Sequence, residues 1–201
     1  MDSPGSMIDG GSPRELFARW VAEACAQTRP PPSELATAYL VDLLAGRLRA
    51  PGDPVANAEA TLAEAWLGAR GAEGARRVER LRAVGDRALF VAGFFGESLA
   101  RKVVGIAYYR DIGQAAYDDL SSWLCRRGWD GTWGGLYREL AERFSVCLEV
   151  LATVGERARA DRACDLLQLH ERWLATGSEA VRRRLLQRGC LVGGRHTRSI
   201  Q

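Results

Sequence analysis

The most apolar run of the chain is ALFVAGFF at residues 88–95, which carries hydrophobic side chains on every face of a helix. A helix without a polar face has to be covered by other elements on all sides. The run is much shorter than the about 20 apolar residues that a membrane-spanning helix needs. We therefore predict a buried central helix here, and no membrane span.

Residues 108–124 follow with a helical pattern that has one apolar and one polar face. Tyr109, Gly113 and Ala116 fall on the apolar face, whereas Arg110 and Asp118 fall opposite. Two small residues in mid-helix predict that another backbone passes close to that face. Packing on the central helix is the first interpretation of this segment.

The segments before the central helix carry helix start and stop signals. Ser12, Pro13 and Glu15 form a capping box with proline at the first helical position. The three prolines at 30–32 end that helix, and Ser33 caps the next one.

Helical spacing continues after this segment as far as the last predicted helix, and no run alternates apolar and polar residues as a strand would. The remaining predicted helices are a third one after a stop signal at 52–54, one at 133–151 that ends near Gly155, one at 158–175 and a short one after Ser178. The prediction is an all-α, single-domain helical bundle of about seven helices at residues 12–189, between flexible segments at 1–11 and 190–201.

Composition narrows the class of protein but not its activity. The formal charge of +3 is small, and the apolar fraction of 47% is ordinary for a globular protein, so global disorder is excluded. The five cysteines form no CxxC pair, which argues against a zinc ribbon and a redox motif. The first dozen residues lack the basic and apolar regions of a secretion signal. We expect a cytoplasmic protein with reduced thiols.

The motifs of common enzyme classes are missing from the sequence. It holds no GxSxG elbow, no GxxxxGK[ST] loop and no GxGxxG after a strand. A di-iron bundle would need Glu-x-x-His pairs, but Leu167 stands three residues before His170. We therefore expect no catalytic residue, no metal and no cofactor, and we favour a non-enzymatic role.

His170 offers one cofactor alternative. It lies among apolar residues of a predicted helix, such as Leu167 and Trp173, and a histidine on an apolar wall can be an axial haem ligand. A core or boundary histidine is the commoner reason for such a position, so haem is the lesser alternative.

Residues 128–135, GWDGTWGG, form the only aromatic-rich loop of the sequence. Tryptophans beside glycines can cover a core edge or anchor a partner, because Trp is frequent among the residues that dominate binding energy. We predict a helical interaction or regulatory module that binds a protein partner, or a second copy of itself, through Trp129, Trp133 and Tyr137.

The first alternative is a small-molecule pocket between the central helices. Asp86 lies where the central helix becomes apolar, so its burial would require a partner such as Arg82, or a hydroxyl group from elsewhere. Aromatic side chains would line the pocket, with Asp86 or Arg110 as the polar group. The predicted residues are Asp86, Phe94, Phe95, Tyr108, Tyr109, Arg110, Tyr117 and His170.

The second alternative is nucleic-acid binding by the carboxy-terminal segment. Residues 179–201 carry six arginines and one acid, which gives six minus one, or +5. Such a charge could contact phosphates, although aromatic residues for base stacking are missing from the segment. The candidate residues are Arg182, Arg183, Arg184 and Arg188.

Three strings resemble those of a group of bacterial proteins known only as hypothetical. They are residues 85–90 (GDRALF), residues 93–95 (GFF) and the tyrosines and small residues between Tyr108 and Tyr117. The resemblance covers about the middle third of the chain. It implies a small bacterial cytosolic protein, and it implies no activity, cofactor or functional residue.

Overall fold

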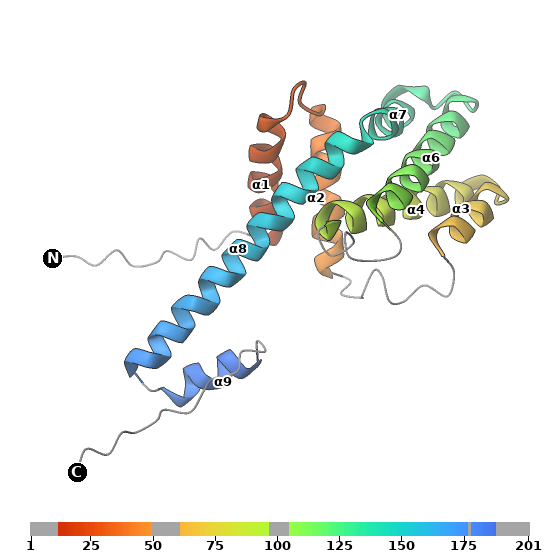
Figure 1. Cartoon of the computed structure of the whole chain (residues 1–201). Helices are drawn as coiled ribbons and strands as arrows, with labels where there is room; N and C mark the ends of the chain where they lie inside the picture. Colours follow the sequence, from red (N-terminus) through yellow and green to blue (C-terminus); the bar gives the residue numbers. More distant parts are fainter. Residues whose placement is uncertain (1–11, 50–60, 97–104, 177, 188–201) are drawn as a thin grey trace, which may run out of the picture. The chain divides into compact units, whose positions relative to one another are not determined.

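The computed structural model describes residues 12–49, 61–96, 105–176 and 178–187. These residues form eight α-helices and a short π-helix, with no strand among them, so the all-α prediction is confirmed (Figure 1). The helices are α1 (Pro13–Gln27), α2 (Glu34–Arg49), α3 (Leu62–Arg70), α4 (Gly74–Phe94), α6 (Ile106–Cys125), η1 (Asp130–Gly134), α7 (Gly135–Glu142), α8 (Phe144–Thr176) and α9 (Glu179–Gln187). The tails predicted at 1–11 and 190–201 lie outside the described residues.

The chain divides into two compact units, Met1–Gly155 and Glu156–Gln201. The boundary between them falls inside α8. The predicted domain limits at residues 12 and 189 stay a prediction.

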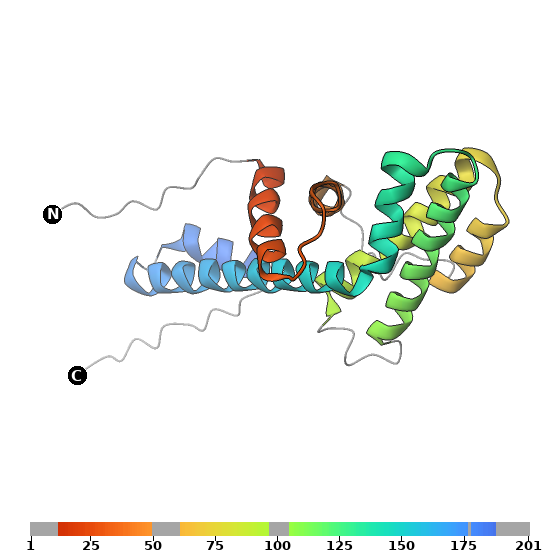
Figure 2. The same ribbon diagram turned by 90° about the horizontal axis from the view of Figure 1, so that it is seen from above.

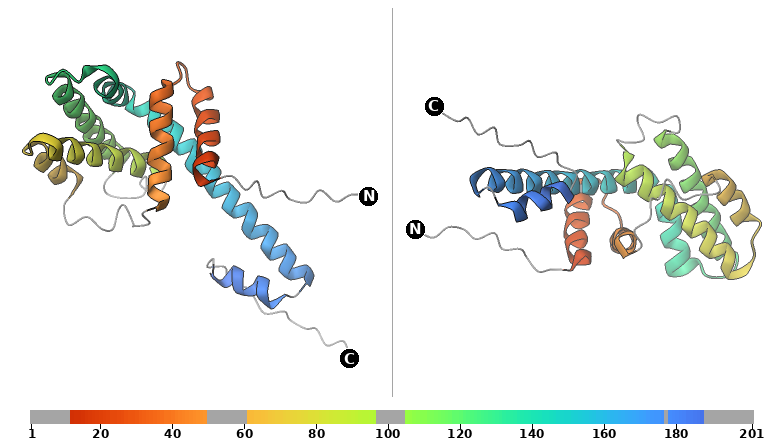
Figure 3. Two further views of the ribbon diagram at one scale, coloured as in Figure 1. Left: turned by 180° about the vertical axis from the view of Figure 1, so that it is seen from behind. Right: turned by 90° about the horizontal axis from the view of Figure 1, so that it is seen from below.

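Helix α4 contains the apolar run and is buried along it, as predicted. Every residue from Ala88 to Phe94 is buried. Helices α3 and α6 pack against α4 and against each other (Figure 3). Burying one Val, Leu or Phe side chain stabilises a fold by about 1.5–3 kcal/mol, so this run is a large source of hydrophobic stabilisation. None of the described helices combines the length and the apolar composition that crossing a membrane requires.

Glycines set how closely α4 and α6 approach. A Cβ atom at Gly113 would lie 2.6 Å from the Cβ of Ala88 and 2.4 Å from the Cζ of Phe144. A Cβ atom at Gly85 would lie 2.4 Å from the Cε1 of Tyr117. Since residue 85 meets 117 and residue 88 meets 113, the two helices run antiparallel. The close approach predicted at Gly113 is confirmed.

The first two helices lie next to each other and are joined by the proline-rich segment (Figure 2). Helix α1 begins with the predicted capping box of Ser12 and Glu15. Before α2, the Oγ of Ser33 accepts a hydrogen bond from the Ala36 N–H at 3.1 Å. Both predicted start signals are confirmed.

Helix α3 begins at a signal that the pattern of glycine and proline did not indicate. The stop signal at 52–54 lies outside the described residues. The Oγ1 of Thr61 accepts a hydrogen bond from the Glu64 N–H, and the Glu64 carboxylate accepts one from the Thr61 N–H. This Thr-x-x-Glu spacing is a second capping box, and it is visible in the sequence.

The helix predicted at 133–151 consists of more than one element, and its predicted end is wrong. Helix α7 ends at Glu142 and α8 begins at Phe144, with Arg143 between them at φ −111° and ψ 27°. Helix α8 then continues through Gly155 to Thr176. One glycine inside a helix costs only about 1 kcal/mol relative to alanine, so it does not have to end the helix.

The second unit contains the end of α8 and the short helix α9, which follows Ser178 as predicted. Val181 and Leu185 are four residues apart on one face of α9, and both are buried. The arginines between them, Arg182 to Arg184, are exposed. Helix α9 is therefore amphipathic, with its positive charge toward solvent.

Candidate functional site

The tryptophan-rich segment is an ordered turn rather than the predicted loop. Gly128 has φ +76°, a left-handed conformation that favours glycine after a helix. The π-helix η1 then carries Trp133 directly into α7. The Gly134 N–H donates a hydrogen bond to the Trp129 carbonyl at 3.1 Å, and the Ser121 Oγ donates one to the Gly134 carbonyl at 2.9 Å. The Trp129 N–H also donates a hydrogen bond to the Leu124 carbonyl at 3.0 Å, so the turn is tied to α6 by this backbone bond and by the Ser121 side chain.

Both tryptophans of this turn are exposed to solvent. Trp129 is 64% exposed and Trp133 is 53% exposed. A tryptophan that covers a core edge would be mostly shielded. The exposure of both side chains therefore favours the anchor interpretation over the lid.

Tyr137, the third residue of the predicted surface, is not on the surface. It is 4% exposed, and its ring stacks on Tyr117 at a centroid distance of 5.8 Å. The reason is helical phase, because Tyr137 lies on the same face of α7 as the buried Leu136, Leu140 and Ala141. The prediction that Tyr137 belongs to an exposed aromatic surface is wrong.

A concavity of about 670 Å³ lies beside Trp129. The first turns of α4, the end of α6 and the turn that follows α6 supply its mainly apolar walls. The lining residues are Gly74, Ala75, Val78, Glu79, Trp123, Arg127 and Trp129. We call this concavity, together with the exposed Trp129 and Trp133, the tryptophan surface.

A second group of polar residues lies inside the first unit, around Asp86. The Asp86 side chain is 16% exposed and accepts hydrogen bonds from the hydroxyl groups of Tyr39 and Tyr117, the latter at 2.8 Å. The Nε of Arg82 lies 3.5 Å from the Asp86 Oδ2. Both predicted kinds of partner, the arginine one turn earlier and a hydroxyl from elsewhere, are present.

Burial raises the pKa values of this group. The pKa of Asp86 is raised, mainly because burial removes water from the carboxylate. The hydrogen bonds from Tyr39 and Tyr117 lower this pKa and so oppose the effect of burial. Desolvation also raises the pKa of Tyr39 and of Tyr117, and the charge of Asp86 adds to it. Both tyrosines therefore stay protonated at neutral pH and act as hydrogen-bond donors.

The residues of the predicted small-molecule pocket do not gather around Asp86. Asp86 and Phe94 are eight residues apart on α4, which is about 12 Å along a helix. Tyr109 and Tyr117 are separated by the same distance on α6. Because the two helices are antiparallel, Tyr117 reaches Asp86 while Tyr109 lies toward the far end of the helix pair.

The other aromatic residues of that prediction pack on one another. Phe94 is buried, and its ring stacks on Phe90 at 5.4 Å between centroids. Phe95 contacts Phe90 edge-on at 5.5 Å. Tyr108 and Tyr109 form a separate edge-on pair at 5.4 Å. These contacts support the packing interpretation of the segment.

The two remaining pocket residues are exposed. Arg110 forms an ion pair with its neighbour Asp111 at 2.8 Å. His170 was predicted to lie on an apolar wall of its helix, but its side chain is exposed to solvent. The exposure of this imidazole to solvent does not support the haem alternative.

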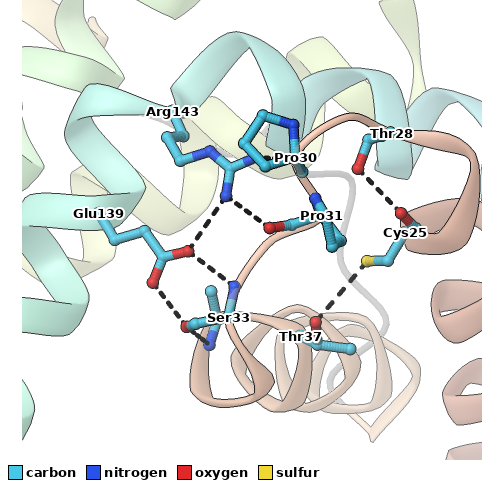
Figure 4. A network of polar contacts seen from close by, with 9 residues as sticks. Cys25, Thr28, Pro30, Pro31, Ser33, Thr37, Glu139 and Arg143 are labelled. Atoms are coloured by element: carbon cyan, nitrogen blue, oxygen red, sulfur yellow. Dashed lines mark hydrogen bonds and ion pairs between the residues drawn. The ribbon is translucent and has the colours of Figure 1, made fainter.

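A network of polar contacts fixes the proline-rich segment to α7 (Figure 4). The Glu139 carboxylate accepts hydrogen bonds from the N–H of Ser33 at 2.8 Å and from its hydroxyl at 2.6 Å. The Nη1 of Arg143 lies 3.5 Å from the Oε1 of Glu139. The Arg143 guanidinium also donates hydrogen bonds to the carbonyls of Pro30 and Pro31. Ser33 and Glu139 are 106 residues apart, so no local pattern could have paired them.

The described cysteines are free thiols, and two of them lie close to this network. Burial is the largest cause of the raised pKa of Cys25, although a hydrogen bond with Thr37 opposes it (Figure 4). Burial also raises the pKa of Cys147 to about 12, and the charge of Glu139 adds to it. Thiols in such surroundings stay protonated, which makes them poor nucleophiles.

The four candidate nucleic-acid residues are only partly described. Arg182 forms an ion pair with Glu179, with 3.0 Å between Nη1 and Oε1. Arg183 and Arg184 are exposed. Arg188 lies outside the described residues. Nucleic-acid binding by this segment stays a prediction. In the part of the chain that the structure describes, no three His, Cys, Asp or Glu side chains gather as a metal site would require.

Comparison with protein-family models, with curated proteins and with solved structures found no match to this chain. The resemblance of residues 85–117 to hypothetical bacterial proteins therefore stays an expectation.

Proposed function

We propose that the protein is a non-enzymatic helical interaction module that binds a protein partner through the tryptophan surface. One observation carries the proposal. Trp129 and Trp133 are more than half exposed although backbone hydrogen bonds order the turn that holds them.

The energetics of burial support this proposal. A Trp side chain presents on the order of 200 Å² of surface, so covering the exposed half of one indole would contribute roughly 2–3 kcal/mol to binding. A partner would not have to order the turn first, which lowers the entropic cost of association. Tryptophan is also the residue type most frequent among those that dominate interface energies.

The proposal includes a second copy of the chain as a partner. Sedimentation velocity of the purified full chain over a range of concentrations distinguishes the two cases. A concentration-dependent increase in sedimentation coefficient that the double variant Trp129→Ala/Trp133→Ala abolishes would identify self-association. A single monomeric species at all concentrations would assign the surface to a different protein.

The central test compares recovery of a partner by three versions of the intact chain. Wild type, Trp129→Ala/Trp133→Ala and the control Leu67→Ala are immobilised and exposed to extract of the source cells. Leu67 is a suitable control because it is 59% exposed on α3. We expect each tryptophan truncation to cost about 2 kcal/mol, so the double variant should recover at least tenfold less of a specific protein. Equal recovery by all three, with unchanged thermal unfolding, would refute the proposal.

A further inference from the structure

We infer that the segment bound by the tryptophan surface is an acidic peptide segment of a protein, in which carboxylates flank one apolar side chain. This inference rests on the proposed function and specifies its partner. It follows from the charge around the tryptophans, the position of one guanidinium group and the walls of the concavity.

Three exposed arginines lie close to the tryptophans in the sequence. Residues 123–138 contain three arginines and one acid, which gives three minus one, or +2. Arg126, Arg127 and Arg138 are all exposed. None of them forms an ion pair with a carboxylate in the described ranges, whereas Arg70 pairs with Asp119 at 3.1 Å. A partner that brings carboxylates to these arginines would not have to displace an ion pair of the described residues.

Arg127 is held in a position that suits a carboxylate. Its guanidinium carbon lies 4.3 Å from the centroid of the Trp123 ring. Stacking occupies one face of the guanidinium, while its N–H donors lie in the plane and remain available at the edge. A preorganised guanidinium can bind a carboxylate with two parallel hydrogen bonds.

The concavity beside Arg127 can accept an apolar side chain. Ala75, Val78 and Trp129 contribute apolar walls to its volume of about 670 Å³. Pockets that hold whole small ligands have volumes of about 300–1,000 Å³, so one Leu or Phe side chain fits with room for its neighbours. The apolar side chain and the flanking carboxylates would then be bound by adjacent parts of one surface.

Nucleic acid fits this surface less well, although tryptophan and arginine also occur together in single-strand binding sites. Glu79 lines the same concavity as Arg127, so the walls lack the continuous positive charge that follows a nucleic-acid backbone. A net charge of +2 is also small beside the basic stripes that bind nucleic acid.

The test measures binding of short fluorescein-labelled synthetic peptides to the full chain by fluorescence anisotropy. One peptide has a central leucine flanked by glutamates. Its matched versions carry glutamine or lysine in place of glutamate, or serine in place of leucine. The proteins are wild type, Trp129→Ala/Trp133→Ala, Arg126→Glu/Arg127→Glu and the equally charged control Arg183→Glu/Arg184→Glu. A single-stranded oligonucleotide with the same label is measured beside the peptides.

We expect wild type and the Arg183→Glu/Arg184→Glu control to bind the glutamate–leucine peptide at least tenfold more tightly than the other peptides and the oligonucleotide. The Arg126→Glu/Arg127→Glu variant should lose that preference or reverse it toward lysine. Equal binding of glutamate and glutamine peptides, tighter binding of the oligonucleotide, or no peptide binding would overturn the inference. The proposed function fails separately, if Trp129→Ala/Trp133→Ala recovers as much partner from extract as wild type does.

Discussion

Two hydroxyl groups keep one carboxylate inside the packed helices of the first unit. Tyr39 and Tyr117 both donate to Asp86, and Gly85 leaves the space that the Tyr117 ring fills. If a buried carboxylate loses a hydrogen-bond donor, the cost of removing the carboxylate from water remains. Removing a donor therefore destabilises the fold by more than the small net free energy of one hydrogen bond. The group is structural in this account.

Removing one donor should therefore destabilise the protein. Tyr117→Phe is expected to lower the free energy of unfolding by about 1–3 kcal/mol, because Asp86 loses a partner while the ring remains. Tyr109→Phe is the control, since no hydrogen bond of its hydroxyl is present within the described residues, and it should change stability by less than about 0.5 kcal/mol. Urea denaturation measures both variants. Equal effects would contradict the assigned role of Tyr117.

The raised pKa of Asp86 predicts a pH dependence of stability. Between the ordinary pKa of an aspartate, about 4, and the higher folded value, the folded chain holds a proton that the unfolded chain has released. The free energy of unfolding therefore decreases as pH rises through this window. Asp86→Asn cannot release a proton and should lack that decrease.

Urea denaturation at a series of pH values checks this prediction. Wild type should lose stability relative to Asp86→Asn as pH rises from about 4. Asp118→Asn, at an exposed position of α6, should follow wild type. A gain of wild type over Asp86→Asn with rising pH would mean that the folded pKa is lowered, not raised.

At the level of elements, close approach of backbones holds the central helices together. Gly113 on α6 contacts Ala88 of α4 and Phe144 of α8, at distances that leave no room for a methyl group. A Cβ atom at Gly46 of α2, by contrast, would have no atom within 4 Å apart from the neighbouring residues of its own helix. The two glycines therefore allow one substitution to be compared in opposite surroundings.

Gly113→Ala should destabilise the protein by about 1–3 kcal/mol through overpacking. Gly46→Ala should stabilise it by about 0.5–1 kcal/mol, because alanine favours the helix and nothing obstructs its methyl group. Thermal or urea unfolding measures both. Stabilisation by both substitutions would show that helix propensity, rather than the α4–α6 approach, decides the result.

The network of Figure 4 connects the α1–α2 pair to α7, and its removal should be costly. Glu139→Ala deletes the acceptor of two hydrogen bonds from Ser33 and the ion pair with Arg143. We expect a loss of about 1–3 kcal/mol in the free energy of unfolding. Glu142→Ala, an exposed position on the same helix, should be nearly neutral. Equal stability of the two variants would mean that the network contributes nothing.

Sequence patterns predicted the local features of this fold and missed those that depend on distant residues. Helical periodicity located the α4 run, and the capping box located the start of α1. The partner of Ser33 lies 106 residues away, and the inward position of Tyr137 depends on the phase of α7 after a kinked turn at Gly131. For the candidate site, the sequence indicated Trp129 and Trp133 but not the concavity, because its walls come from α4 and α6.

For the whole molecule, the proposed function lies at the surface and not among the packed helices of the first unit. Asp86 is enclosed with its partners, and the tyrosines beside it stay protonated. The tryptophan surface combines exposed aromatic area with an apolar concavity. The proposed function requires that the tryptophan surface contacts a protein in the cell.

Photo-crosslinking in the source cells tests this most directly. A benzophenone amino acid replaces Trp133 in the full chain, and the control places it at Leu67, which has a similar exposed fraction on α3. The account predicts a discrete protein adduct from position 133 that is absent from position 67 and weakened by Trp129→Ala. No adduct from position 133, or the same adducts from both positions, would contradict it.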